Sequence, residues 1–145
     1  MDLAYTYPVS NFESAVVVDL NTRAARERLS KSALKGFFKL ARAWDLRDDE
    51  ACALLGGISS SAFYEWKKKP ARILEVDRIT RISYLLGIYK ALHILYGDAL
   101  ADRWPKLPNT NVIFAGKTPL LYMQEGGLLA MQTVRKLLDA RRGGV

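Results

Sequence analysis

The sequence predicts an all-α protein. Between residues 22 and 142, most apolar residues recur at helical spacing, and glycine and proline separate one stretch from the next. The clearest β-type run in that range, Val112–Phe114, is too short to form a sheet by itself. Half of the 145 residues are hydrophobic, which is enough for one substantial core or two small ones.

Composition excludes several classes of protein. No apolar run approaches the roughly 20 residues that a membrane helix needs, and the N-terminus lacks the basic start and apolar run of a signal peptide. We therefore expect a cytoplasmic protein with no membrane partner. The single cysteine, Cys52, permits no intrachain disulfide and is predicted to be a small buried residue. No ligand spacing predicts a metal, and no cofactor is expected.

The positive charge begins where the helices begin. The net charge is +7, yet residues 1–20 hold three acids and no base, whereas residues 21–81 hold 14 Lys and Arg against 8 acids. A basic domain of this size favours an anionic partner such as DNA or RNA. Residues 1–20 are predicted to form an N-terminal arm that is either disordered or docked on a second copy of the chain.

The first helix is predicted to start after Asn21 or Thr22, either of which can cap it. Its apolar positions continue to about Trp44, and Gly36 is a candidate break within it. The opposite face carries a basic stripe, which the simplest interpretation treats as solvated surface.

Two short helices follow the first. One comes after Asp48 and Asp49, whose charges suit a helix N-terminus, and ends at Gly56–Gly57. The next starts at Ser59 or Ser60 and is stopped by Pro70. Two short helices around a glycine turn are the pattern of a helix-turn-helix.

The residue types at this turn meet the needs of that motif. Gly57 supplies a turn residue that tolerates positive φ, Ala53 is small where the helices meet, and Ile58 follows the turn. Phe63 and Trp66 are predicted to anchor the second helix. The outward-facing side chains that are candidates for binding phosphates and base edges are Ser59, Ser60, Ser61, Tyr64, Lys67 and Lys68. The alternative is a structural hairpin whose lysines serve solubility.

A long amphipathic helix over residues 74–96 is the predicted spine of the fold. A loop or short helix over 98–104 and a proline-rich segment follow it. Gly126–Gly127 is predicted to separate a turn over 118–125 from a final helix over 128–142. The chain is thus divided into the arm, a helix-turn-helix domain over 21–81 and a small helical domain over 82–145.

No constellation predicts catalysis, so we expect that the protein is not an enzyme. His93, the single histidine, is interpreted as a packed or half-exposed core residue, and Asp98 and Asp102 as solvated helix residues. Gly116–Thr118 is not a phosphate-binding loop, because no GxxxxGK precedes it and Pro119 follows it.

One ordered set of residues near the C-terminus carries a family resemblance. Trp104, Pro108–Asn109, Gly116–Leu120, Gly126 or Gly127, and Val134 with Leu137–Leu138 occur in this order. The segment resembles the Xre/MbcA/ParS-type toxin-binding domain of bacterial type II antitoxins. The upstream LLGGISSSAFYEWKKKP resembles the Xre-like helix-turn-helix that these antitoxins carry.

The resemblance implies a non-enzymatic antitoxin whose partner is a RES-domain toxin, similar to ADP-ribosyltransferases and acting on NAD. It also implies a homodimer, a higher-order complex with the toxin, and binding to promoter DNA of its own operon. The expected mechanism is occlusion of the toxin's active site. The residues predicted to bind the toxin are Asn109, Gly116, Lys117, Thr118, Pro119, Arg135, Arg141, Arg142 and Val145. The alternative is a stand-alone transcription regulator whose C-terminal domain only dimerises.

Overall fold

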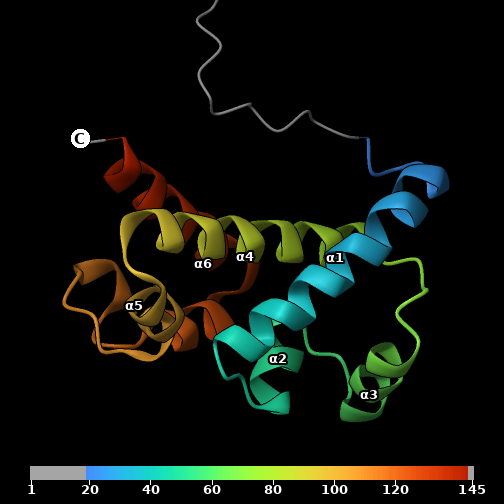
Figure 1. Ribbon diagram of the computed structural model, residues 1–145, viewed down its shortest axis with the longest axis horizontal. Coiled ribbons are helices and arrows are strands. Elements are labelled where there is room, and N and C mark those ends of the chain that lie inside the picture. The colour runs from blue at the N-terminus through green and yellow to red at the C-terminus, as the bar shows by residue number, and fades with distance from the viewer. Residues whose placement is uncertain (1–18, 144–145) are drawn as a thin grey trace, which may run out of the picture.

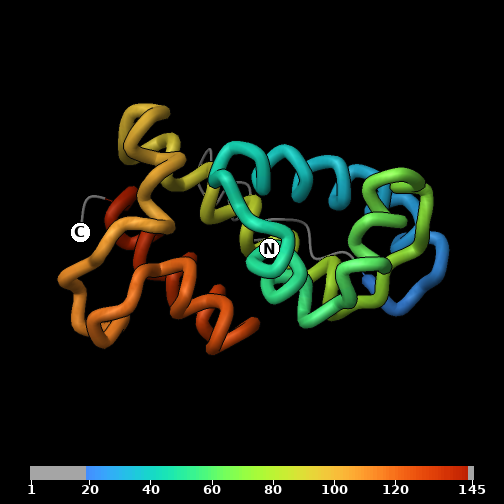
Figure 2. Tube along the Cα trace, turned by 90° about the horizontal axis from the view of Figure 1, so that it is seen from below, coloured from blue at the N-terminus to red at the C-terminus, as the bar shows by residue number. Residues whose placement is uncertain are grey.

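The computed structural model describes residues 19–143, and every regular element in that range is helical. The all-α prediction is therefore confirmed. The predicted arm, except for its last two residues, and Val145 lie outside the described residues. Helices α1 to α3 occupy one half of the molecule, and the segments after residue 97 occupy the other half (Figures 1 and 2).

Helix α1 (Arg23–Ala43) begins at Thr22, whose hydroxyl accepts a hydrogen bond from the Ala25 amide at 3.2 Å. Gly36 does not break the helix, so that prediction was wrong. Its missing side chain instead allows close packing on α4, since a Cβ at residue 36 would lie 3.0 Å from Leu86. The helix ends at Ala43, and Asp45, just beyond the capping residue Trp44, has φ 52°.

Helix α4 (Val76–Leu95) is the spine that the sequence predicts. It packs against α1 on one side and α6 on the other (Figure 1). These two helix pairs make the most extensive contacts between elements in the described part of the chain. One cluster of buried side chains runs from Leu34 of α1 through Leu85 of α4 to Leu138 of α6. The two predicted domains thus share a core, and the boundary at residue 81 stays a prediction.

Short segments connect α4 to the last helix. They are α5 (Asp98–Arg103) and the 3₁₀ turns η1 (Trp104–Lys106) and η2 (Val112–Phe114). The β-branched run at 112–114 is therefore a helical turn and not an extended segment. The Asn111 side chain caps it by accepting from the Ile113 amide at 3.0 Å, and Ala115 ends it at φ 50°.

Helix α6 (Pro119–Arg142) starts earlier than predicted. Thr118 caps it, accepting from the Leu121 amide at 3.2 Å, so residues 119–125 are helical and their interpretation as a turn was wrong. Gly127 interrupts the helix with φ 63° and ψ −143°, a conformation that glycine adopts without steric cost. The predicted division at Gly126–Gly127 is therefore a kink between two helical halves.

Candidate functional site

The pair of helices α2 (Asp48–Leu54) and α3 (Ser60–Lys68) forms the predicted helix-turn-helix. Gly57 has φ 85°, as its predicted role at the turn requires, and its amide donates to the Cys52 carbonyl at 2.9 Å. Phe63 and Trp66 are 2% and 7% exposed, which confirms that they anchor α3 in the core. The structure thus holds one face of α3 inward and leaves the other in solvent.

The outward face of α3 carries hydroxyl and ammonium groups. Ser59 caps the helix, accepting from the Ala62 amide at 3.1 Å, and its hydroxyl lies 3.3 Å from that of Ser61. Tyr64 is 58% exposed, and the Lys68 ammonium lies 4.6 Å from its ring centroid. Ser60 is also exposed. Such groups suit contact with phosphates and base edges.

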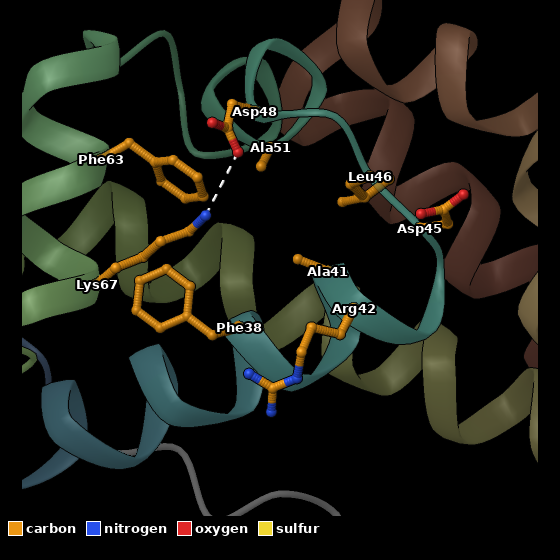
Figure 3. Close-up of a pocket in the computed structure, with 9 residues that line it drawn as sticks. All are labelled: Phe38, Ala41, Arg42, Asp45, Leu46, Asp48, Ala51, Phe63 and Lys67. Atoms are coloured by element: carbon orange, nitrogen blue, oxygen red, sulfur yellow. Dashed lines mark hydrogen bonds and ion pairs between the residues drawn. The ribbon is translucent and has the colours of Figure 1, made fainter.

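Lys67 lies apart from the other candidates. Its ammonium is 3.3 Å from the Asp48 carboxylate and 4.6 Å from the Phe63 ring centroid, on the side of α3 that faces α1 and α2 (Figure 3). The cleft there has a volume of about 490 Å³ and is lined by Phe38, Ala41, Arg42, Asp45, Leu46, Asp48, Ala51, Phe63 and Lys67. Lys67 is thus engaged within the protein.

The loop candidates for partner binding shape the entry to α6. The Asn109 side chain accepts from the Asn111 amide at 2.9 Å, and Gly116 has φ 84°. Lys117 forms an ion pair with Glu125 at 3.0 Å. Thr118 caps α6, and the buried Pro119 occupies its first position, where an amide hydrogen is not needed.

The arginine candidates lie on the second half of α6 and have polar contacts of their own. Arg135 pairs with Asp139 at 3.0 Å, and Arg142 lies 3.6 Å from the same carboxylate. Arg141 donates to the Tyr96 hydroxyl at 3.1 Å. The loop and the arginines therefore make separate sets of contacts, the first with Glu125 and the second with Asp139 and Tyr96.

His93 has two carboxylate partners that the sequence reasoning missed. Its Nδ1 lies 2.9 Å from Asp98 and its Nε2 lies 2.7 Å from Asp102. Both acids are helix residues and Asp98 is solvated, as predicted, but each also binds the imidazole. Burial lowers the pKa of the imidazole, but the hydrogen bonds and charges of the two carboxylates outweigh that effect, and the pKa is raised. The pattern Asp98-x-x-x-Asp102 on one short helix was the available signal.

Two buried polar residues, Ser30 and Glu50, belong to no sequence motif but connect distant parts of the described chain. The Ser30 hydroxyl accepts a hydrogen bond from the Leu74 amide, and Glu50 forms an ion pair with Lys106. Burial raises the pKa of the Cys52 thiol.

Among residues 19–143 we find no cluster of metal-ligating side chains and no helix long and apolar enough to cross a membrane.

Comparison with known proteins gives two matches. The chain is 39% identical over 112 residues to the uncharacterized protein y4oB of Sinorhizobium fredii. The aligned region covers 77% of this chain and 84% of the relative. Residues 22–87 match the model of the antitoxin Xre-like helix-turn-helix domain. The chain is related to y4oB, and its residues 22–87 carry an antitoxin-type Xre-like helix-turn-helix domain. Antitoxins with this domain are typically not enzymes.

The matched range contains α1, α2, α3 and residues 76–87 of α4. The antitoxin-type domain indicates DNA and a toxin as general classes of partner. The part of the chain after residue 87 lies outside the matched range, and it includes every residue predicted to bind a toxin.

Proposed function

We propose that the protein is an antitoxin that binds promoter DNA of its own operon and neutralises an NAD-consuming RES-domain toxin by covering its active site. The observation that carries the proposal is the antitoxin-type helix-turn-helix, complete with its positive-φ glycine turn and an exposed polar face. The ordered Trp104 to Leu138 motif, which resembles a toxin-binding domain, supports a RES-domain toxin as the partner.

The DNA-binding half rests on α3. Ser59, Ser60, Ser61, Tyr64 and Lys68 present hydroxyl and ammonium groups toward a duplex, and Lys67 joins them only if it leaves Asp48. A helix-turn-helix of this kind reads two half-sites about 34 Å apart when it is dimeric. A homodimer is therefore part of the proposal.

The toxin-binding half rests on the chain after α4. Four large exposed apolar side chains lie there among the described residues: Val112 at 89%, Leu129 at 76%, Leu121 at 42% and Leu100 at 37%. Exposed apolar side chains are typical of protein-binding surfaces where they lie together, and the proposal takes Val112 and Leu129 as members of one such surface. Arg135, Arg141 and Arg142 add cations that suit the phosphate-binding entrance of an NAD cleft. Neutralisation by occlusion then requires no chemistry from the antitoxin.

Co-expression with the product of the adjacent gene, followed by pull-down and an assay of NAD loss, tests this half. Val112→Asp with Leu129→Asp is expected to abolish capture of the toxin and protection of NAD, while promoter binding and the melting temperature stay unchanged. The matched control is Val76→Asp, which makes the same kind of change at an apolar residue that is 39% exposed at the start of α4. It should leave capture of the toxin intact. Full protection by the double variant would contradict this assignment of the surface.

A narrower test concerns the end of α6. Deleting residues 139–145 removes Asp139, the partner of Arg135, so loss of neutralisation by that truncation would have two explanations. Arg141→Gln removes only the hydrogen bond to Tyr96 and one charge. Tyr96→Phe removes the same bond and keeps the charge. Weaker toxin inhibition by Arg141→Gln, but not by Tyr96→Phe, is the expected result.

A stand-alone transcription regulator is the second candidate. The family match ends at residue 87, which is compatible with a C-terminal part that only dimerises. Binding of the promoter by a dimer, together with failure to capture the neighbouring gene product, would favour this alternative.

A further inference from the structure

We propose that the DNA backbone is held by two residues that follow α3, Lys69 and Arg72, which we call the phosphate ridge. The inference rests on the proposed DNA binding and deepens it, because it states which edge of the helix-turn-helix faces the duplex. Both side chains are exposed, and neither belongs to the outward face of α3. Lys69 forms no ion pair with the described residues.

The loop that carries the ridge is held in place at several points. The Arg72 amide donates to the Pro70 carbonyl at 3.0 Å, which closes a tight turn. Leu74 is 2% exposed, and its amide donates to the Ser30 hydroxyl of α1 at 2.8 Å. The Ser30 hydroxyl in turn donates to the Arg26 carbonyl at 2.5 Å. The ridge therefore stands on an ordered connection between α3 and α4.

An aromatic ring orients the guanidinium of Arg72. The group lies 5.0 Å from the centroid of Trp66, and that of Arg78 lies 5.7 Å from the same ring. Arg78 is also paired with Glu75 at 3.2 Å, so it is occupied within the protein. A guanidinium held over an aromatic ring keeps N–H groups at its edge for phosphate oxygens, and a held side chain loses less entropy on binding.

The opposite edge of the motif offers less attraction to phosphate, because its cations are already paired with acids. Helix α2 begins with Asp48 and Asp49, which lie 3.3 Å from Lys67 and 3.0 Å from Arg47. In helix-turn-helix proteins the first helix of the motif crosses the DNA backbone, so acids at its start disfavour close approach there. The loop over 69–75 rises from α3 on the side away from α2 (Figure 1). Charge thus favours a docking in which the duplex is shifted toward the ridge.

Fluorescence anisotropy over a salt series, using the full-length protein, tests the ridge. Two duplexes of equal length are needed, the DNA upstream of the chain's own coding sequence and a shuffled version of it. Lys69→Gln and Arg72→Gln are expected to weaken binding of both duplexes by the same factor. The plot of the logarithm of the association constant against the logarithm of salt concentration has a negative slope. Its magnitude should decrease by about 0.9 for each substituted residue, as expected for the loss of one phosphate contact.

Matched variants separate the ridge from general charge. Lys90→Gln on α4 makes the same change of charge at another exposed position and should leave the slope unchanged. Arg72→Lys keeps the charge but loses the guanidinium that lies over the Trp66 ring, so it should bind DNA more tightly than Arg72→Gln and more weakly than wild type. Asp48→Asn with Asp49→Asn should tighten binding or leave it unchanged. Melting temperatures within a few degrees of wild type show that each variant is folded.

Three results would overturn the inference. If wild-type protein binds DNA and the Lys69→Gln, Arg72→Gln double variant has the same salt slope, the two residues do not contact phosphates. That result contradicts the phosphate ridge but not the proposed function. Weaker binding by the Asp48→Asn, Asp49→Asn variant reverses the proposed docking edge. Wild-type protein that binds neither duplex at low salt overturns the DNA-binding half of the proposed function, and the ridge with it.

Discussion

The ammonium group of Lys106 lies 3.5 Å from the carboxylate of Glu50, which is 8% exposed. Lys106 also donates a hydrogen bond to the Asp45 carbonyl. The same Glu50 carboxylate accepts from the Arg47 amide at 2.9 Å and so caps α2. One buried acid thereby joins the helix-turn-helix to η1, in the part of the chain predicted to bind a toxin.

Removing either partner should destabilise the protein. Lys106→Met leaves the buried carboxylate with only the Arg47 guanidinium, 3.8 Å away, and should lower the free energy of unfolding by about 1 kcal/mol, because the lysine is partly exposed. Glu50→Gln weakens the cap as well and should cost about 1–2 kcal/mol. Urea unfolding of both single variants and the double variant measures the coupling. A double variant whose loss equals the sum of the single losses would mean that the pair is not coupled.

Gly87 of α4 makes room for Arg135 of α6. A Cβ at residue 87 would lie 1.6 Å from the Arg135 guanidinium, so Gly87→Ala must displace that side chain. Alanine favours a helix interior by roughly 0.5–1 kcal/mol, and the stability should therefore change by less than about 1 kcal/mol. Toxin inhibition should fall if Arg135 acts from its present position. Gly87→Ala added to Arg135→Gln should cause no further loss, and a further loss would indicate a wider disturbance.

The bonds of His93 to Asp98 and Asp102 should make stability depend on pH. The pKa of the folded imidazole is raised, so the folded state binds more protons than the unfolded state as pH rises from about 6.5 through the folded pKa. The stabilisation is fully present below the unfolded pKa of about 6.5 and is lost above the folded pKa. The advantage of wild type over Asp102→Asn in urea unfolding should therefore be larger at pH 6 than at pH 9. An equal difference at both pH values would exclude this linkage.

Ala115 has φ 50°, in a region where alanine costs about 1–2 kcal/mol. Ala115→Gly removes that cost but adds freedom to the unfolded chain, so a net gain of about 0.5 kcal/mol is expected. The neighbouring Gly116 has φ 84°, and Gly116→Ala should destabilise by about 1 kcal/mol. Thermal unfolding of the two variants should show shifts of opposite sign. Shifts of the same sign would contradict the argument from backbone strain.

The outward face of α3 should serve DNA alone. Tyr64→Ala with Lys68→Ala removes an exposed ring and the ammonium above it, without touching the buried anchors Phe63 and Trp66. Promoter binding should weaken, on the order of tenfold or more, while toxin capture stays intact. Anisotropy and pull-down on the same preparation give both readings. Loss of both activities together would mean that this face of α3 is structural.

Much of the fold follows from local signals. The turn at Gly57 and the anchors Phe63 and Trp66 depend on neighbouring residues and were predicted correctly. Each cap was narrowed to two adjacent residues, of which the structure uses Thr22 and Ser59. The errors arose where local signals were ambiguous. Gly36 serves helix packing and breaks no helix, and residues 119–125 extend α6 because Thr118 caps them and Pro119 is favourable at a first helical position.

The sequence by itself determined the class of the protein, its helix-turn-helix and the resemblance to antitoxins, because periodicity, capping and turn chemistry act within a few residues. Only the tertiary structure decided which polar groups meet. Ser30 reaches the Leu74 amide, Lys106 reaches Glu50, and Arg72 covers Trp66 through contacts that no short-range pattern encodes. It also decided that Lys67 faces Asp48 inside a cleft and that His93 lies between two carboxylates. Such contacts depend on how α1, α4 and α6 pack, and that packing is set by the shared core as a whole.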